Sequence, residues 1–235
     1  INGSIMLNKD KEALKAFFKE NVKPNYLRFD SLQDKLDYLL ENNYIEKGFL
    51  NKYSFEFVIK LFKFVYSKDF RFKSFMAAYK FYSQYAMKTN DNTKYLESFE
   101  DRVAFNALYF ANGDEELAWN LADELINQRY QPATPSFLNA GRARRGEFIS
   151  CFLLDVTDDM NSIGRSINSA LQLSKIGGGV GINLSNIREA GASIKGYEGA
   201  ASGVVPIMKM LEDSFSYANQ LGQRQGAGAV YLNVF

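Results

Sequence analysis

Apolar and polar residues follow one period in the first part of this chain and a different one after Tyr130. Up to Tyr130, apolar residues recur every three or four positions, which predicts amphipathic helices. The predicted helices cover residues 9–22, 31–44, 54–67, 75–88, 93–113 and 114–130. Asn112 and Gly113 predict the end of the fifth helix, and Asp114 predicts the N-cap of the sixth.

After Tyr130, short apolar runs alternate with helical segments. The two prolines in residues 131–136 predict an irregular segment. Strands are predicted at 148–156, which we expect to be buried, and at 180–184 and 228–235. Helices are predicted at 160–176, opened by Asp158 or Asp159, and at 204–220. Strands and helices at this spacing predict crossover units with a parallel sheet or half barrel. We therefore expect an α/β fold, with a helical domain over residues 1–130 and an α/β domain over residues 131–235.

Composition restricts the classes of partner. The chain has 235 residues, 46% of them apolar, and its net charge is only +1. A net charge this close to zero does not indicate a nucleic acid or an anionic membrane as a binding partner. No apolar run approaches the roughly 20 residues of a membrane span, and the N-terminus lacks the features of a signal peptide, so we expect a cytoplasmic protein. The chain opens on Ile1 and stops at Phe235 directly after a predicted strand, and we expect it to be a fragment.

Cys151 is the only cysteine, and histidine is absent from the sequence. These counts exclude a Cys/His zinc site, a Ser-His-Asp triad and an internal disulfide built from this chain alone. Two interpretations of Cys151 remain open. It is either a buried structural thiol or a redox thiol whose partner lies elsewhere.

Three consecutive glycines, Gly177 to Gly179, raise the possibility of a phosphate loop. A Walker loop places Gly-Lys-Ser/Thr at the start of a helix, whereas here Lys175 precedes the glycines and a strand follows them. A dinucleotide-binding fingerprint fails because its third glycine would fall on Ile182 or Leu184. Two interpretations remain: the close approach of a ligand to a backbone without Cβ atoms, or a tight turn from helix to strand.

Three charged residues flank the predicted helix and strand around these glycines: Asp158, Lys175 and Arg188. If that helix packs on the strand, the three could gather around one polar ligand. The carboxylate would accept from sugar hydroxyls and the cations would neutralise phosphates. The alternative is that each is a solvated surface charge. A second glycine-rich loop, residues 220–228, could bind a base edge or could simply connect two elements.

The sequence resembles the large (α) subunit of ribonucleoside-diphosphate reductases, most closely those of class Ib. Four stretches carry the resemblance, at residues 128–154, 174–196, 201–209 and 215–233. The helical part resembles the family more loosely, and since no ATP-cone segment is recognisable at its start, we expect the overall activity site of class Ia to be absent. The resemblance implies a helical domain followed by the first part of a ten-stranded α/β barrel, incomplete in this chain. It implies an enzyme that reduces ribonucleoside diphosphates to 2′-deoxyribonucleoside diphosphates by thiol and radical chemistry.

The resemblance also assigns substrate contacts. Cys151 corresponds to one cysteine of the redox pair, which donates hydrogen at C2′ and ends in a disulfide with a cysteine further along the family sequence. Thr134 and Ser150 correspond to residues that hold the substrate diphosphate and ribose. Gly179 corresponds to a glycine whose backbone lies against the substrate.

A second set of residues corresponds to the allosteric specificity site. Asp158, Lys175 and Arg188 match positions that bind a deoxynucleoside triphosphate or ATP, with Mg²⁺, at the interface of an α homodimer. The loop that transmits effector identity to substrate choice corresponds to residues 220–224, with Gln220, Gly222 and Arg224.

The resemblance implies no metal or cofactor bound directly by this chain. It implies a β subunit with a tyrosyl radical beside two iron or manganese ions, the remaining part of the α subunit, and a glutaredoxin-like or thioredoxin reductant. Two rival interpretations remain. One is a piece of a class II reductase, which would use adenosylcobalamin; the other is a nucleotide-binding regulatory module without catalytic function, in which Cys151 is buried.

Overall fold

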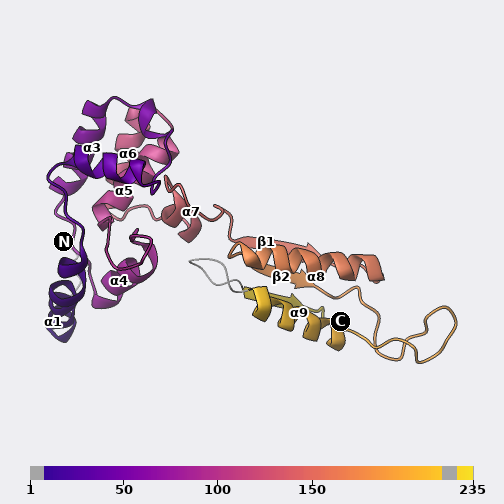
Figure 1. Ribbon diagram of the computed structural model, residues 1–235. Coiled ribbons are helices and arrows are strands. Elements are labelled where there is room, and N and C mark those ends of the chain that lie inside the picture. Colours follow the sequence, from indigo (N-terminus) through magenta and orange to yellow (C-terminus); the bar gives the residue numbers. More distant parts are fainter. Residues whose placement is uncertain (1–7, 219–226, 235) are drawn as a thin grey trace. The chain divides into compact units, whose positions relative to one another are not determined.

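The computed structural model describes residues 8–218 and 227–234 and divides into two compact units, Ile1–Arg145 and Gly146–Phe235 (Figure 1). Residues 131–145, which the sequence pattern groups with the α/β domain, belong to the first unit, because Phe137 is buried in its core. No helix in the described ranges is long and apolar enough to cross a membrane.

The first unit consists of helices, and all six helices that the sequence predicts here are present (Figure 1). Two of them, α1 and α4, continue directly into short π-helical turns at Phe18–Val22 and Phe81–Tyr85. The helices are α1 Asn8–Phe17, α2 Leu32–Glu41, α3 Phe55–Ser67, α4 Phe75–Lys80, α5 Phe99–Ala111, α6 Glu115–Ile126 and α7 Thr134–Asn139.

Capping residues set the limits of α5 and α6. The helix predicted from residue 93 begins only at Phe99, because Ser98 and Asp101 form a capping box that starts it there. Asn112 ends α5 in the left-handed conformation, at φ +53°. The predicted cap of α6 is confirmed, since the Asp114 carboxylate accepts a hydrogen bond from the Leu117 backbone nitrogen at 2.9 Å.

Helix α7 corrects the prediction of an irregular segment at residues 131–136. Thr134 is its first residue, and Pro135 lies in its first turn, where the missing backbone N–H costs no hydrogen bond. Proline at this point starts a helix, and the sequence pattern alone does not distinguish this use of proline from a turn.

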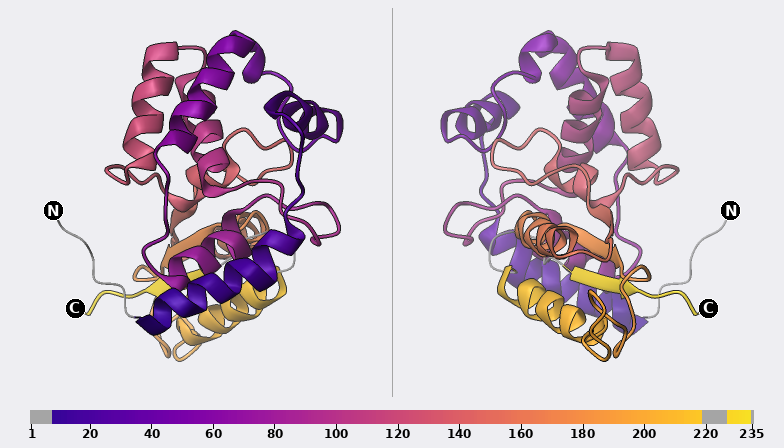
Figure 2. Two further views of the ribbon diagram at one scale, coloured as in Figure 1. Left: turned by 90° about the vertical axis from the view of Figure 1, so that its left-hand side faces the viewer. Right: turned by 90° about the vertical axis from the view of Figure 1, so that its right-hand side faces the viewer.

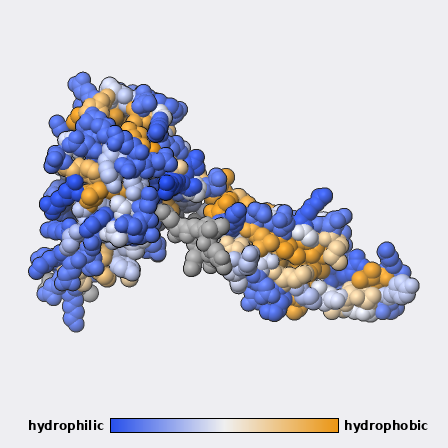
Figure 3. Space-filling view, viewed as in Figure 1, coloured by the Kyte–Doolittle hydropathy of each residue, from blue (hydrophilic) through white to orange (hydrophobic). Residues whose placement is uncertain are grey.

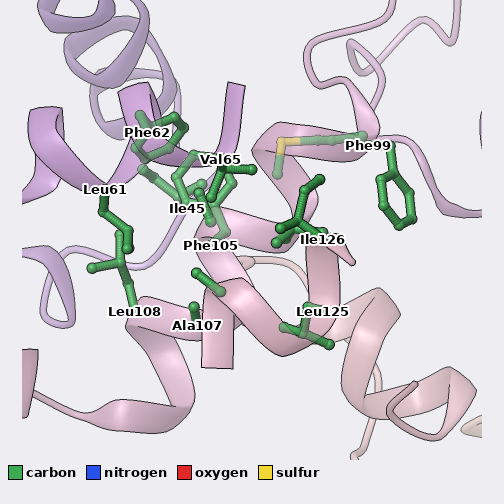
Figure 4. Close-up of a cluster of buried hydrophobic side chains, with 14 of the residues drawn as sticks. Ile45, Leu61, Phe62, Val65, Phe99, Phe105, Ala107, Leu108, Leu125 and Ile126 are labelled. Carbon is green, nitrogen blue, oxygen red and sulfur yellow. The ribbon is translucent and has the colours of Figure 1, made fainter. Parts of the chain in front are cut away.

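Helix α5 lies at the centre of the core of the first unit. Almost all of its residues are buried, and it packs against α3 and α6. Figure 4 shows Phe105 and Leu108 of α5 among side chains from α3 and from the loop at Ile45. The burial of each such side chain stabilises the fold by about 1.5–3 kcal/mol.

The second unit contains the parallel strands β1 Cys151–Asp155, β2 Gly179–Asn183 and β3 Ala227–Tyr231, in that spatial order. Helix α8, Met160–Lys175, connects β1 to β2, and α9, Val205–Ala218, lies between β2 and β3 in sequence. The predicted parallel crossover arrangement is therefore confirmed. The sheet has three strands and is not closed within the described part of the chain.

One face of this sheet packs against α8 and α9, which lie side by side (Figure 2). Val180 and Ile182 of β2 point into that core, together with Leu154 of β1. The other face, which we call the open face, carries the alternate residues of each strand, and Leu153 there is 84% exposed. The expectation of a buried strand at 148–156 was therefore wrong for this chain. Apolar surface gathers over this unit in Figure 3.

Candidate functional site

Cys151 is the first residue of β1 and lies on the open face of the sheet. Its register partner in β2 is Gly179, whose backbone nitrogen donates a hydrogen bond to the Ser150 carbonyl oxygen at 2.7 Å. The Ser150 hydroxyl lies 3.7 Å from the Cys151 sulfur. Cys151 is an exposed, free thiol. Its interpretation as a buried structural residue was therefore wrong for this chain.

The three consecutive glycines have three different structural settings. Gly177 adopts φ +82°, which suits glycine at the turn that ends α8. A Cβ atom on Gly178 would lie 2.6 Å from the Phe152 ring and 2.9 Å from the Leu173 carbonyl oxygen. Within residues 8–218 and 227–234, the nearest atom to a Cβ atom on Gly179 would be the Ser150 carbonyl oxygen, at 3.4 Å. The turn and its packing thus explain the first two glycines but not the third, where a Cβ atom would make only an ordinary van der Waals contact with the described residues.

Further along the open face, the sheet carries contacts that the sequence pattern did not reveal. A Cβ atom on Gly181 would lie 2.9 Å from the Leu153 side chain and 3.0 Å from the Tyr231 ring, so these two side chains cover the glycine. Beyond them, the Asn183 side chain donates to Asp155 at 2.8 Å. Parallel register could have indicated these neighbours, because it aligns equivalent positions of adjacent strands.

Asp158 and Arg188 form an ion pair in which Arg188 Nε lies 2.5 Å from Asp158 Oδ2. Asp158 follows β1 and Arg188 follows β2, and the carboxyl ends of parallel strands share one edge of a sheet. Arg188 also donates to the Ser193 carbonyl oxygen at 3.2 Å. The N-cap of α8 is Asp159, which accepts from the Ser162 nitrogen at 2.8 Å, and Asp158 is therefore not needed as the cap.

Lys175 does not join this pair within the chain. It is the last residue of α8, whose 16 residues begin close to Asp158. With a rise of about 1.5 Å per residue, the two ends of such a helix lie about 22 Å apart. The structure thus brings together two of the three charged residues that the sequence grouped.

Thr134 lies in the first unit, at the start of α7. Its Oγ1 accepts a hydrogen bond from the Tyr85 hydroxyl at 3.2 Å. No local pattern singles out Tyr85, since 49 residues separate it from Thr134. The predicted loop residues Gln220, Gly222 and Arg224 lie outside the described residues.

Three family models match consecutive parts of the chain. They describe the ribonucleotide reductase N-terminal region at residues 1–70, the ribonucleotide reductase all-alpha domain at 71–145 and the ribonucleotide reductase barrel domain at 149–235. The chain belongs to the ribonucleotide reductase family. Its three parallel strands form the start of the reductase barrel domain, which is not closed within these residues.

Reductase large subunits are similar to the chain over 72% to 100% of its length. The ribonucleoside-diphosphate reductase subunit alpha of Bacillus subtilis (strain 168) is 54% identical over 234 residues, which cover 100% of this chain and 33% of that protein. The subunit of the same name from Mycoplasma pneumoniae is 54% identical over 95% of this chain and 31% of its own length. That of Chlamydia muridarum is 36% identical over 72% of this chain. The chain corresponds to the N-terminal portion of such large subunits and spans about a third of the first two.

Proposed function

We propose that this chain supplies substrate contacts, one redox cysteine and the effector site to a ribonucleoside-diphosphate reductase of class Ib. The observation that carries this proposal is the exposed thiol of Cys151 opposite Gly179, a position where the chain leaves room for a ligand. Membership of the reductase family supports the type of chemistry.

In the proposed reaction, Cys151 and a second cysteine outside this chain are the reductant. Together the two thiols give two electrons and two protons. The C2′–OH bond of the ribose is replaced by C2′–H, the hydroxyl leaves as water, and the two sulfurs form a disulfide. Exchange with the thiols of a glutaredoxin-like or thioredoxin protein restores them. An exposed thiol at the start of a strand suits this role because both substrate and reductant must reach it.

The substrate contacts in this proposal are Ser150, Gly179 and Thr134. Ser150 precedes Cys151 and has a hydroxyl close to the sulfur, so it suits a contact with the ribose. Gly179 would admit the substrate to the backbone of β2. The hydroxyl of Thr134 would donate to the diphosphate.

The proposed effector is a deoxynucleoside triphosphate or ATP, with Mg²⁺. The Asp158–Arg188 pair supports this assignment, since a carboxylate and a guanidinium together offer an acceptor for sugar hydroxyls and a bidentate donor for phosphate. For Lys175 to contact the same nucleotide, that nucleotide would have to lie between two copies of the chain, which agrees with an α homodimer. Gln220, Gly222 and Arg224 would form the loop that senses the effector base.

The proposed partners are the remaining part of the α subunit and a radical-generating β subunit. The remainder of α would complete the barrel and cover the unpaired edges of β1 and β3. The β subunit would carry the tyrosyl radical beside two iron or manganese ions, and it starts the reaction.

Reconstitution tests the proposed function. An α subunit that contains this chain, mixed with β, a dithiol reductant and an effector, should reduce ribonucleoside diphosphates over many turnovers. Cys151→Ser should lower the turnover number more than about 100-fold, because an alcohol cannot form the disulfide. Circular dichroism and thermal unfolding should be unchanged, since the side chain is exposed. Unimpaired turnover by Cys151→Ser would exclude the redox role.

A further inference from the structure

Helix α7 holds Thr134 at its first residue, and buried donors from α5 hold the other end of α7. Asn106 Nδ2 donates to the Phe137 carbonyl oxygen at 3.0 Å. Arg102 Nη1 donates to the Leu138 carbonyl oxygen at 3.3 Å, and its Nη2 donates to that of Ala140. Arg102 and Asn106 are both fully buried.

These contacts compensate for the short length of α7. A helix of 6 residues leaves most of its carbonyl groups without partners inside the helix, and it would not be stable alone. From the largely buried helix α5, Arg102 and Asn106 satisfy the carbonyl groups of Leu138 and Phe137, and Arg102 also satisfies that of Ala140, the residue after α7. The backbone that carries Thr134 is therefore fixed by the core.

Tyr85 holds the Thr134 side chain at the opposite end of α7, and two further contacts fix Tyr85 itself. Its hydroxyl donates to Thr134 Oγ1 at 3.2 Å. Its ring packs on Phe137, with ring centroids 5.8 Å apart. Its carbonyl oxygen accepts from Arg142, which is ion-paired at 2.7 Å with the fully buried Glu97.

We propose that Tyr85 is a positioning residue that aims the Thr134 hydroxyl at the substrate diphosphate. This inference rests on the substrate role proposed above for Thr134. A threonine hydroxyl has one proton and two acceptor positions. When it accepts the phenol proton of Tyr85, its own proton remains free for an outside acceptor, and the phenol polarises it toward a stronger donor. Without Tyr85, rotation about the threonine χ1 and C–O bonds would spread that proton over several directions.

The first test is Tyr85→Phe in the full α subunit, assayed with β, reductant and a fixed effector. The ring and its contact with Phe137 are kept, and only the hydroxyl is lost. We expect KM for the ribonucleoside diphosphate to rise about 3-fold to 10-fold, the usual range for one hydrogen bond, with kcat changed less than about 2-fold. The matched control is Tyr44→Phe, which loses a hydrogen bond from the Asn90 nitrogen at 3.2 Å and should leave KM unchanged.

A double-mutant cycle separates positioning from a structural role. In a Thr134→Ala background, Tyr85→Phe should have no further effect on KM, because the hydroxyl that it aims is gone. Two results would overturn the proposal. One is an equal rise of KM when Tyr85→Phe is made in the wild type and in the Thr134→Ala variant, and the other is no rise of KM when it is made in the wild type. If the wild-type subunit does not reduce diphosphates at all, the proposed function fails instead, and the two failures are thereby distinguished.

A second variant keeps the proposal testable if Tyr85→Phe does not fold. Thr134→Ser retains the hydroxyl but lacks the methyl group that restricts its rotation. While Tyr85 is present, it should fix the serine hydroxyl as well, and KM should stay within about 2-fold of the wild type. A rise of KM as large as that of Thr134→Ala would show that Tyr85 does not control the hydroxyl.

Discussion

Cys151 and Gly179 lie directly opposite each other in neighbouring parallel strands, and among the residues that the structure describes a Cβ atom on Gly179 would contact only the Ser150 carbonyl oxygen, at 3.4 Å. The preceding residue differs sharply, because a Cβ atom on Gly178 would collide with the Phe152 ring at 2.6 Å. The fold therefore requires glycine at 178 but not at 179. This contrast allows stability and function to be tested separately at adjacent positions.

The Gly179→Ala substitution should leave the free energy of unfolding within about 0.5 kcal/mol of the wild type, the usual range for an accommodated substitution. In the complete reductase it should raise KM for the diphosphate or lower kcat, since the methyl group would project into the space beside Cys151. Denaturant unfolding and steady-state kinetics measure the two effects. Full activity of Gly179→Ala would remove the argument for close substrate approach.

Gly178→Ala is the matched control. Unlike Gly179→Ala, it should lower the free energy of unfolding and leave KM and kcat close to the wild-type values. The added methyl group must displace the Phe152 ring or the Leu173 carbonyl group, which we expect to cost about 1–3 kcal/mol of stability. Equal stability of the two alanine variants would contradict the packing described for this turn.

Replacement of Asp158 or Arg188 by alanine should reduce the effect of deoxynucleoside triphosphates on substrate preference more than it reduces basal reduction. The reason is that the two residues pair at the carboxyl edge of the sheet, away from Cys151, which begins β1. Substrate competition assays with and without effector measure the change. Lys209→Ala, which removes two exposed ion pairs on α9, is the control. Equal loss of regulation and basal activity would count against the effector assignment.

Asp101 should make the first unit sensitive to acid. The carboxylate is buried, which by itself raises its pKa, but Lys35 at 2.5 Å and hydrogen bonds from Ser98 and Tyr66 hold the pKa below its ordinary 3.8. A carboxyl group with a lowered folded pKa stabilises the protein above its unfolded pKa, and that contribution is lost as pH falls through the folded value. Urea unfolding from pH 6 to pH 3 should thus show a loss of stability that Asp101→Asn lacks. If the free energy of unfolding depended on pH in the same way in the wild type and in Asp101→Asn, Asp101 would not be the source of the acid sensitivity.

The buried Glu97 carboxylate forms ion pairs with two buried guanidinium groups. It lies 2.7 Å from Arg142 and 3.5 Å from Arg102, and burial lowers the pKa of Arg102 to about 10. Glu97→Gln keeps the shape but removes the negative charge, and we expect it to lower the free energy of unfolding by about 3–5 kcal/mol. The control is Asp69→Asn, which breaks the exposed pair with Arg71 and should change stability little. Comparable unfolding curves for the two variants would contradict the role of Glu97.

The sequence by itself determined the α-helices other than α7, the parallel crossover arrangement and the family. Apolar periodicity follows directly from the geometry of helices and strands, and Asp114 is recognisable as a cap because capping is local along the chain. Cys151 could be singled out by chemistry alone, as the only thiol.

Only the tertiary structure decided which side chains meet. It paired Asp158 with Arg188 and left Lys175 at the far end of α8, since helix length and strand direction fix those positions. It also joined Tyr85 to Thr134. Such contacts depend on how separate helices and strands pack against each other. A local sequence pattern does not predict this packing for residues that are distant in the sequence.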